Sequence, residues 1–131
     1  FWANNQDMEP RPAATNVLMS GGGTSTEDMI RSIRRGVLIT RFWYIRPLNP
    51  RTLSYTRITR DGTFLIENGR ISRPANNFRF NQSLVALLES VEMLSTPTRV
   101  AAGENSSVGV PIVVPALKVR SFNLSRVSEA I

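Results

Sequence analysis

The residues that most often carry catalysis are scarce in this sequence. It contains no His and no Cys, so it lacks the commonest general base, the commonest metal ligand and every thiolate site. A Ser–Lys pair would have to use Lys118, and Asp61 or Glu67 could act as acids, but none of them lies in a recognisable motif. We therefore predict no catalytic residue and no metal ligand in this chain.

The net charge is the one unusual feature of the composition. It is +6 over 131 residues, from 15 Arg and a single Lys against 10 carboxylates. This balance permits an anionic partner such as nucleic acid. The Arg residues are scattered rather than massed in a block, so we favour a solvated surface. No segment is long enough to span a membrane, because Pro111 and Pro115 interrupt the best apolar run.

Two segments could bind an anion or a base. Residues 41–46, RFWYIR, interleave aromatic rings with cations, as in surfaces that stack single-stranded nucleic acid. On a strand, however, Trp43 would point away from Phe42 and Tyr44, and core packing is the better explanation. The Gly-rich residues 20–25 precede a helix but lack the Lys-Ser/Thr of a phosphate-binding loop, so we favour a flexible turn.

The first elements that must position these residues are a strand over 13–19 and a helix. Thr24 and Glu27 form a capping-box pattern, and Met29, Ile30 and Ile33 give an apolar stripe. Gly36 is the expected stop after the helix.

The middle of the chain predicts an antiparallel meander of strands over 37–45, 51–60, 63–67 and 70–73. Pro47 and Pro50 mark the first turn, and Asp61-Gly62 and Asn68-Gly69 are dipeptides typical of two-residue hairpin turns. With the last turn, Glu67 faces Arg70.

A second helix is expected from Asn81 or Ser83 through Leu94, because Leu84, Leu87, Leu88, Val91 and Leu94 recur at helical spacing. Strands near 99–102, 110–114 and 116–122 follow. The sequence therefore predicts a single domain over 1–131 of the α+β class, predominantly antiparallel β, with two covering helices. A closed, barrel-like arrangement of the meander is an alternative.

Several long motifs resemble the C-terminal part of the TldD/PmbA family, once labelled modulators of DNA gyrase. They are TRFWYIRPLNPRT (40–52), TRDGTFLIENG (59–69), NFRFNQS (77–83), VPALKVRSF (114–122) and, ahead of them, ATNVLMSGG (14–22). The resemblance covers nearly the whole chain.

The resemblance implies a cytoplasmic, oligomeric zinc metalloprotease that cleaves extended peptides, with its HExxxH helix upstream of this region. In metal-binding members a Cys in a Gly-rich loop completes the zinc site. The corresponding loop here is approximately Gly103, Glu104, Asn105, Ser106 and Ser107, which contains no Cys. The full-length parent would therefore use another third ligand, or be a metal-free partner subunit.

On this basis we expect a non-catalytic, β-rich C-terminal fragment of a longer protein. It would hold no cofactor itself, with zinc in the parent as an option. Its partners would be the missing N-terminal catalytic region, other subunits in a homo- or hetero-oligomer, and a peptide substrate. The candidates for lining the substrate cleft are Arg41, Trp43, Tyr44 and Arg46. The alternatives are a basic β-domain that binds nucleic acid and a purely structural oligomerisation module.

Overall fold

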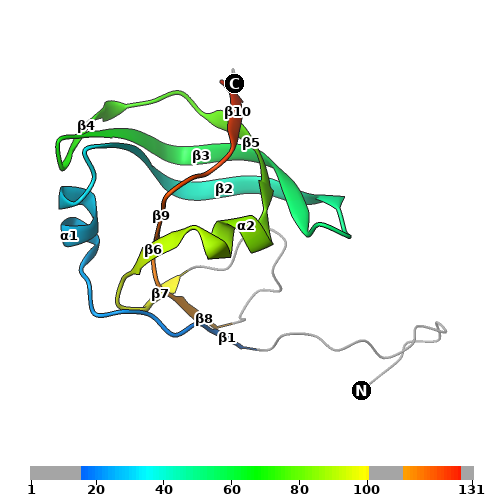
Figure 1. Cartoon of the computed structure of the whole chain (residues 1–131), viewed down its shortest axis with the longest axis horizontal. Helices are drawn as coiled ribbons and strands as arrows, with labels where there is room; N and C mark the ends of the chain where they lie inside the picture. The colour runs from blue at the N-terminus through cyan, green and yellow to red at the C-terminus, as the bar shows by residue number, and fades with distance from the viewer. Residues whose placement is uncertain (1–15, 101–110, 128–131) are drawn as a thin grey trace.

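The computed structural model describes residues 16–100 and 111–127, which are rich in strands (Figure 1). In chain order the elements are β1 (Val17–Leu18), α1 (Thr26–Arg31), β2 (Arg35–Asn49), β3 (Ser54–Glu67), β4 (Arg70–Pro74), β5 (Phe78–Ser83), α2 (Leu84–Glu89), β6 (Val91–Leu94), β7 (Thr98–Val100), β8 (Ile112–Val114), β9 (Leu117–Val119) and β10 (Leu124–Val127). The predicted α+β class with two helices is confirmed, and both helices are short.

The largest sheet has five strands in the order β10-β5-β3-β2, with β4 also paired to β3. All of its pairs are antiparallel. β4 and β5 pair with successive parts of β3, while β2 follows β3 along nearly its whole length. The path ends at β10 and at β2, so the described strands do not close into a barrel. β2 is an edge strand of this sheet.

Two smaller sheets flank the large one. β6 pairs with β9 in antiparallel fashion, and β8 lies between β1 and β7. The β1–β8 pair is parallel, which the predicted meander did not include. These pairs join the N-terminal and C-terminal parts of the described chain (Figure 1).

The predicted hairpin turn at Asp61-Gly62 is wrong, because β3 runs straight through it. Ile39 pairs with Thr63 and Arg41 pairs with Arg60, so Asp61 and Gly62 together oppose Thr40 alone. This is a β-bulge, in which two residues of one strand face one residue of the other. Asp61 has φ +56° and Gly62 has φ +139°. The Asp-Gly dipeptide thus supplies the positive φ angles expected of it, within a long strand instead of a turn.

The predicted turn at Asn68-Gly69 is confirmed, with Glu67 opposite Arg70 and Ile66 opposite Ile71. Its backbone N–H groups donate hydrogen bonds to the segment that follows α1. Asn68 N donates to Arg34 O at 2.8 Å, and Gly69 N donates to Ile33 O at 2.9 Å. The turn therefore fixes the segment that connects α1 to β2 against the hairpin.

The first helix begins one residue later than predicted. Ser25 is the N-cap, its hydroxyl oxygen accepts from the Asp28 backbone N–H at 3.0 Å, and Asp28 replaces Glu27 as the acidic partner. The helix ends at Ser32, whose hydroxyl donates to Met29 O at 2.6 Å. Gly36 is not the helix stop, since it lies in β2 opposite Ile66.

The second helix is much shorter than predicted. It ends at Glu89, and Ser90 caps it by donating through its backbone N–H to Ala86 O and Leu87 O. Val91 and Leu94, which continue the apolar stripe, belong to β6 and pair with β9. Tertiary pairing overrides the helical periodicity here. Leu84 and Leu88 remain 40% and 57% exposed, so the helix covers the sheet mainly through Leu87.

The core is small and centres on the large sheet. Met29, Ile66 and Phe80 are buried. Phe80 meets Phe42 edge to face at 5.1 Å between ring centroids, and Phe122 stacks on Phe42 at 5.6 Å. These three rings come from β5, β2 and the segment after β9. They join the predicted NFRFNQS motif, which forms β5, to the edge strand.

Candidate functional site

The outer half of β2 is open to solvent. From Arg41 to Asn49 every residue except Trp43 is exposed. In the part of the chain that the structure describes, β2 pairs with β3 alone. Pro47 fits this placement, because a residue that cannot donate to a ladder is tolerated on an edge strand. All four predicted cleft residues therefore lie on one open edge.

Trp43 contacts two guanidinium groups. Arg41 is 4.8 Å and Arg60 is 4.3 Å from the centre of its ring, measured from Cζ. Asp61 accepts from Arg41 at 2.7 Å and lies 3.5 Å from Arg60 Nε. We call these four residues the Trp43 stack. The bulge of β3 places Asp61 where its carboxylate pairs with both cations and offsets part of their charge.

Tyr44 also contacts two guanidinium groups. Arg46 Cζ is 4.4 Å and Arg57 Cζ is 4.5 Å from the ring centre, and Arg46 donates a hydrogen bond to the Tyr44 hydroxyl. We call these three residues the Tyr44 stack. Neither Arg forms an ion pair with any residue that the structure describes.

A second β-bulge creates the Tyr44 stack. Trp43 pairs with Ile58 and Arg46 pairs with Thr56, so Tyr44 and Ile45 both oppose Arg57. Tyr44 has φ +59°, an uncommon angle for a bulky side chain. The bulge brings the ring of Tyr44 over Arg57 and interrupts the ladder at the middle of the exposed edge.

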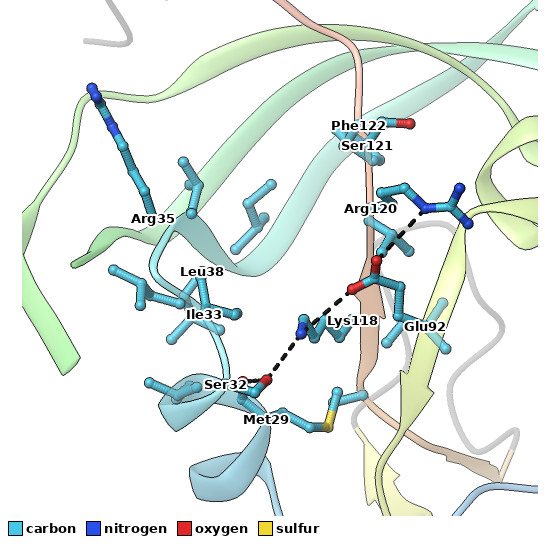
Figure 2. Close-up of a pocket in the computed structure, with 18 of the residues that line it drawn as sticks. Met29, Ser32, Ile33, Arg35, Leu38, Glu92, Lys118, Arg120, Ser121 and Phe122 are labelled. Carbon is cyan, nitrogen blue, oxygen red and sulfur yellow. Dashed lines mark hydrogen bonds and ion pairs between the residues drawn. The ribbon is translucent and has the colours of Figure 1, made fainter. Parts of the chain in front are cut away.

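A cavity of about 700 Å³ opens beside this edge strand, between α1, the start of β2 and the segment from Ala116 to Leu124 (Figure 2). Its walls are mainly apolar and include Met29, Ile33, Leu38 and Phe122. A smaller cavity of about 240 Å³ lies next to it and shares Phe42, Leu87 and Phe122 with it. The apolar stripe of α1 is visible in the sequence, but no residue pattern there indicates that it borders a cavity.

A cluster of polar side chains lines one side of the larger cavity. Lys118 Nζ donates to the Ser32 hydroxyl at 2.9 Å and lies 3.4 Å from Glu92, which is also 3.6 Å from Arg120 (Figure 2). Ser32 also donates to the Met29 backbone. This arrangement ties α1 to β9 and β6. Lys118 has its acidic partner, so the Ser–Lys pairing considered from the sequence is an ion-paired bridge between elements.

Asp28, a carboxylate with a lowered pKa, lies outside both stacks. The hydroxyl of Ser25 donates to Asp28 at 2.7 Å and Arg31 donates to the same carboxylate at 2.7 Å. The Ser25 hydrogen bond, and then that of Arg31, lower the pKa of Asp28 below its ordinary value. Its role is to cap α1.

The chain matches the model of the PmbA/TldA metallopeptidase C-terminal domain family over residues 3–126. The chain belongs to this family. The fold agrees with that of TldE from Thermococcus kodakarensis, whose crystal structure it matches with a TM-score of 0.62 and 24% identity. The match covers 80% of this chain and 22% of the TldE chain, so it spans about a fifth of that protein's length. No curated protein matches the sequence.

The name of the family implies a metal, and the residues described here do not fit one. Zinc in proteins is held by His nitrogen, Cys sulfur or carboxylate oxygen. This PmbA/TldA domain has no His and no Cys, and residues 16–100 and 111–127 contain no group of three or more carboxylates that could hold an ion. The loop Gly103–Ser107, predicted to correspond to the Cys-bearing loop of the family, lies outside the described residues.

No helix within the described part of the domain has the length and apolar character needed to cross a membrane.

Proposed function

We propose that this domain is the non-catalytic, peptide-facing part of a TldD/PmbA-like metallopeptidase, or of its metal-free partner subunit. The observation that carries the proposal is the family match over residues 3–126. The composition supports it, because a chain without His or Cys leaves the metal ligands to another part of the assembly. We further propose that the assembly is a cytoplasmic homo- or hetero-oligomer.

The edge of β2 is the proposed contact with substrate. A protease that acts on extended chains can hold them by adding a strand to an open sheet edge, with backbone hydrogen bonds giving affinity. β2 is such an edge, and its outer half is exposed. Arg41, Trp43, Tyr44 and Arg46 lie along it. Tyr44 and Arg46 would meet the substrate's side chains, while Arg41 and Trp43 would support the strand. In the free protein the two bulges and the charged residues deter unwanted pairing of the same edge.

Two measurements test the proposal. Metal analysis and a casein cleavage assay on this chain alone should show no bound zinc and no hydrolysis. The full-length parent, alone or with its partner subunit, should cleave an extended peptide and lose that activity on treatment with a chelator. Stoichiometric zinc in this chain, or cleavage by it, would contradict the assignment.

The nucleic-acid alternative makes a different prediction. A basic β-domain would retard single-stranded DNA or RNA in a gel shift, and the affinity would fall steeply with salt as counterions are released. We expect no retardation at physiological salt, because Arg41 and Arg60 are already paired with Asp61, which offsets part of their charge.

A further inference from the structure

The Tyr44 stack has the form of an anion site without its anion. Arg46 and Arg57 both lie within 4.5 Å of the centre of one ring, and neither has a carboxylate partner among residues 16–100 and 111–127. Two cations that converge on one ring repel each other. In the Trp43 stack the equivalent repulsion is offset in part by Asp61, which pairs with both cations.

Arg57 has a donor that lacks an acceptor. Its Nε is buried and makes no hydrogen bond within the described structure. A buried donor without a partner is unfavourable, and such groups are rare in folded proteins. The guanidinium of Arg46 reaches only the Tyr44 hydroxyl, which is a neutral acceptor. The stack therefore has charge-assisted hydrogen bonds left to make.

The backbone at this point is held in an unfavourable conformation. Tyr44 keeps a φ of +59° although it is a bulky residue. Strained residues of this kind persist where the surrounding structure imposes them, and they cluster at binding sites. Here the strain directs an aromatic ring and two cations to the middle of an open edge.

We propose that Arg46, Arg57 and the Tyr44 hydroxyl bind a carboxylate of an extended peptide that pairs with the edge of β2. The planar guanidinium suits a carboxylate because two of its N–H groups can donate in parallel. A peptide is favoured over a nucleic acid because the ladder groups of β2 lie beside the stack and are matched by another peptide backbone. The carboxylate comes from an acidic side chain or from the peptide's C-terminus.

This inference depends on the proposed function only for the source of the carboxylate, an extended peptide. The carboxylate site itself is tested by equilibrium binding, without turnover or metal. A parent that fails to hydrolyse peptide would leave the binding result standing, so the two failures are distinguishable.

The test is a fluorescence anisotropy titration of this chain with three short strand-forming peptides that carry a neutral dye. The first is Val-Thr-Glu-Val-Thr with an amidated C-terminus, the second has Gln in place of Glu, and the third is the Gln peptide with a free C-terminal carboxylate. The Glu peptide should bind about tenfold more tightly than its amidated Gln counterpart. The third peptide shows whether a C-terminal carboxylate serves as well as a side chain.

Matched variants assign the effect to the stack. Arg46→Gln and Arg57→Gln should each reduce the preference for Glu to about twofold or less, whereas Arg41→Gln should leave it unchanged, since Arg41 is already paired with Asp61. Arg46 is exposed, so Arg46→Gln should keep the melting temperature of the parent. The proposal can therefore be tested even if Arg57→Gln destabilises the fold.

Three outcomes would overturn the proposal. The first is equal binding of the Glu and Gln peptides, including no binding of either at millimolar concentration. The second is a preference for Glu that survives in Arg46→Gln. The third is tighter binding of an oligothymidylate that Arg46→Gln abolishes, which would assign the stack to phosphate.

Discussion

The Trp43 and Tyr44 stacks are built from the same parts on the same two strands, yet they differ in charge. Each has one ring from β2 in contact with an Arg of β2 and an Arg of β3. The Trp43 stack includes Asp61, which the bulge of β3 holds against both cations. The Tyr44 stack has no such group. The comparison indicates that the first is a self-contained structural unit and that the second is arranged for a partner.

The bulge that places Asp61 should be the most sensitive point of the comparison. Gly62→Val puts a β-branched residue at φ +139° and its Cβ against the Thr40 side chain. We expect a loss of about 1–3 kcal/mol in the free energy of unfolding, measured by thermal or denaturant melts. Gly69→Val should lose a similar amount, since its Cβ would lie 2.7 Å from Arg31 O. Gly23→Val, with open space around it, is the control, and equal melts for all three variants would refute the assignment of the bulge.

The two rings should differ in their contribution to stability. Trp43 is partly buried, and Trp43→Ala should lower the free energy of unfolding by about 2 kcal/mol through lost apolar area. Tyr44 is 47% exposed, and Tyr44→Ala should cost less than about 1 kcal/mol. Urea melts of both variants measure the difference. If Tyr44→Ala proved the more damaging, the Tyr44 stack would be a structural unit and the contrast would fail.

Removing the carboxylate should make the first stack resemble the second. Asn tolerates the positive φ of residue 61, so Asp61→Asn keeps the bulge and deletes the charge. Because the ion pairs are exposed, the free energy of unfolding should fall by only about 0.5–1 kcal/mol. The variant should also gain affinity for the Glu peptide in the anisotropy assay. A stable variant without that gain would show that an unpaired Arg pair is not sufficient for binding.

A carboxylate remote from both stacks gives the smallest expected effect. Its lowered pKa means that Asp28 stabilises the fold at neutral pH, and that this contribution is lost as the pH falls through the folded-state pKa. Ser25→Ala removes the largest cause, so the pKa of Asp28 should rise toward its ordinary value. Carboxyl ¹³C titration by NMR measures the shift. If the pKa of Asp28 rose by the same amount in Asp61→Asn, the Trp43 stack would also influence Asp28.

The sequence was a better guide to residue types than to strand lengths. Asn68-Gly69 forms the expected turn, but Asp61-Gly62 forms a bulge, because both need positive φ and the dipeptide alone cannot distinguish them. The apolar stripe from Leu84 to Leu94 predicted one helix. Its second half is instead a strand, because Val91 pairs with Val119. Local periodicity does not contain the distant strand that decides the outcome.

The candidate site was predicted in part. The motif at 40–52 singled out Arg41, Trp43, Tyr44 and Arg46, and the structure places them together on an open edge. Arg57 and Arg60 were not predicted as site residues. Their only signal in the sequence is that they lie on the strand expected to pair with β2. Their register depends on two bulges, so the stacks could not be read from a regular two-residue alternation.

The central claim is that the Tyr44 stack meets substrate while the Trp43 stack supports the fold. The most direct measurement is kcat/KM of the full-length parent, or of its reconstituted complex, for an extended peptide that contains Glu. Arg46→Gln should lower kcat/KM about tenfold with little change in melting temperature, and Arg41→Gln should change it by less than about twofold. Equal activity in the two variants, or a loss in Arg46→Gln explained by unfolding, would contradict the account.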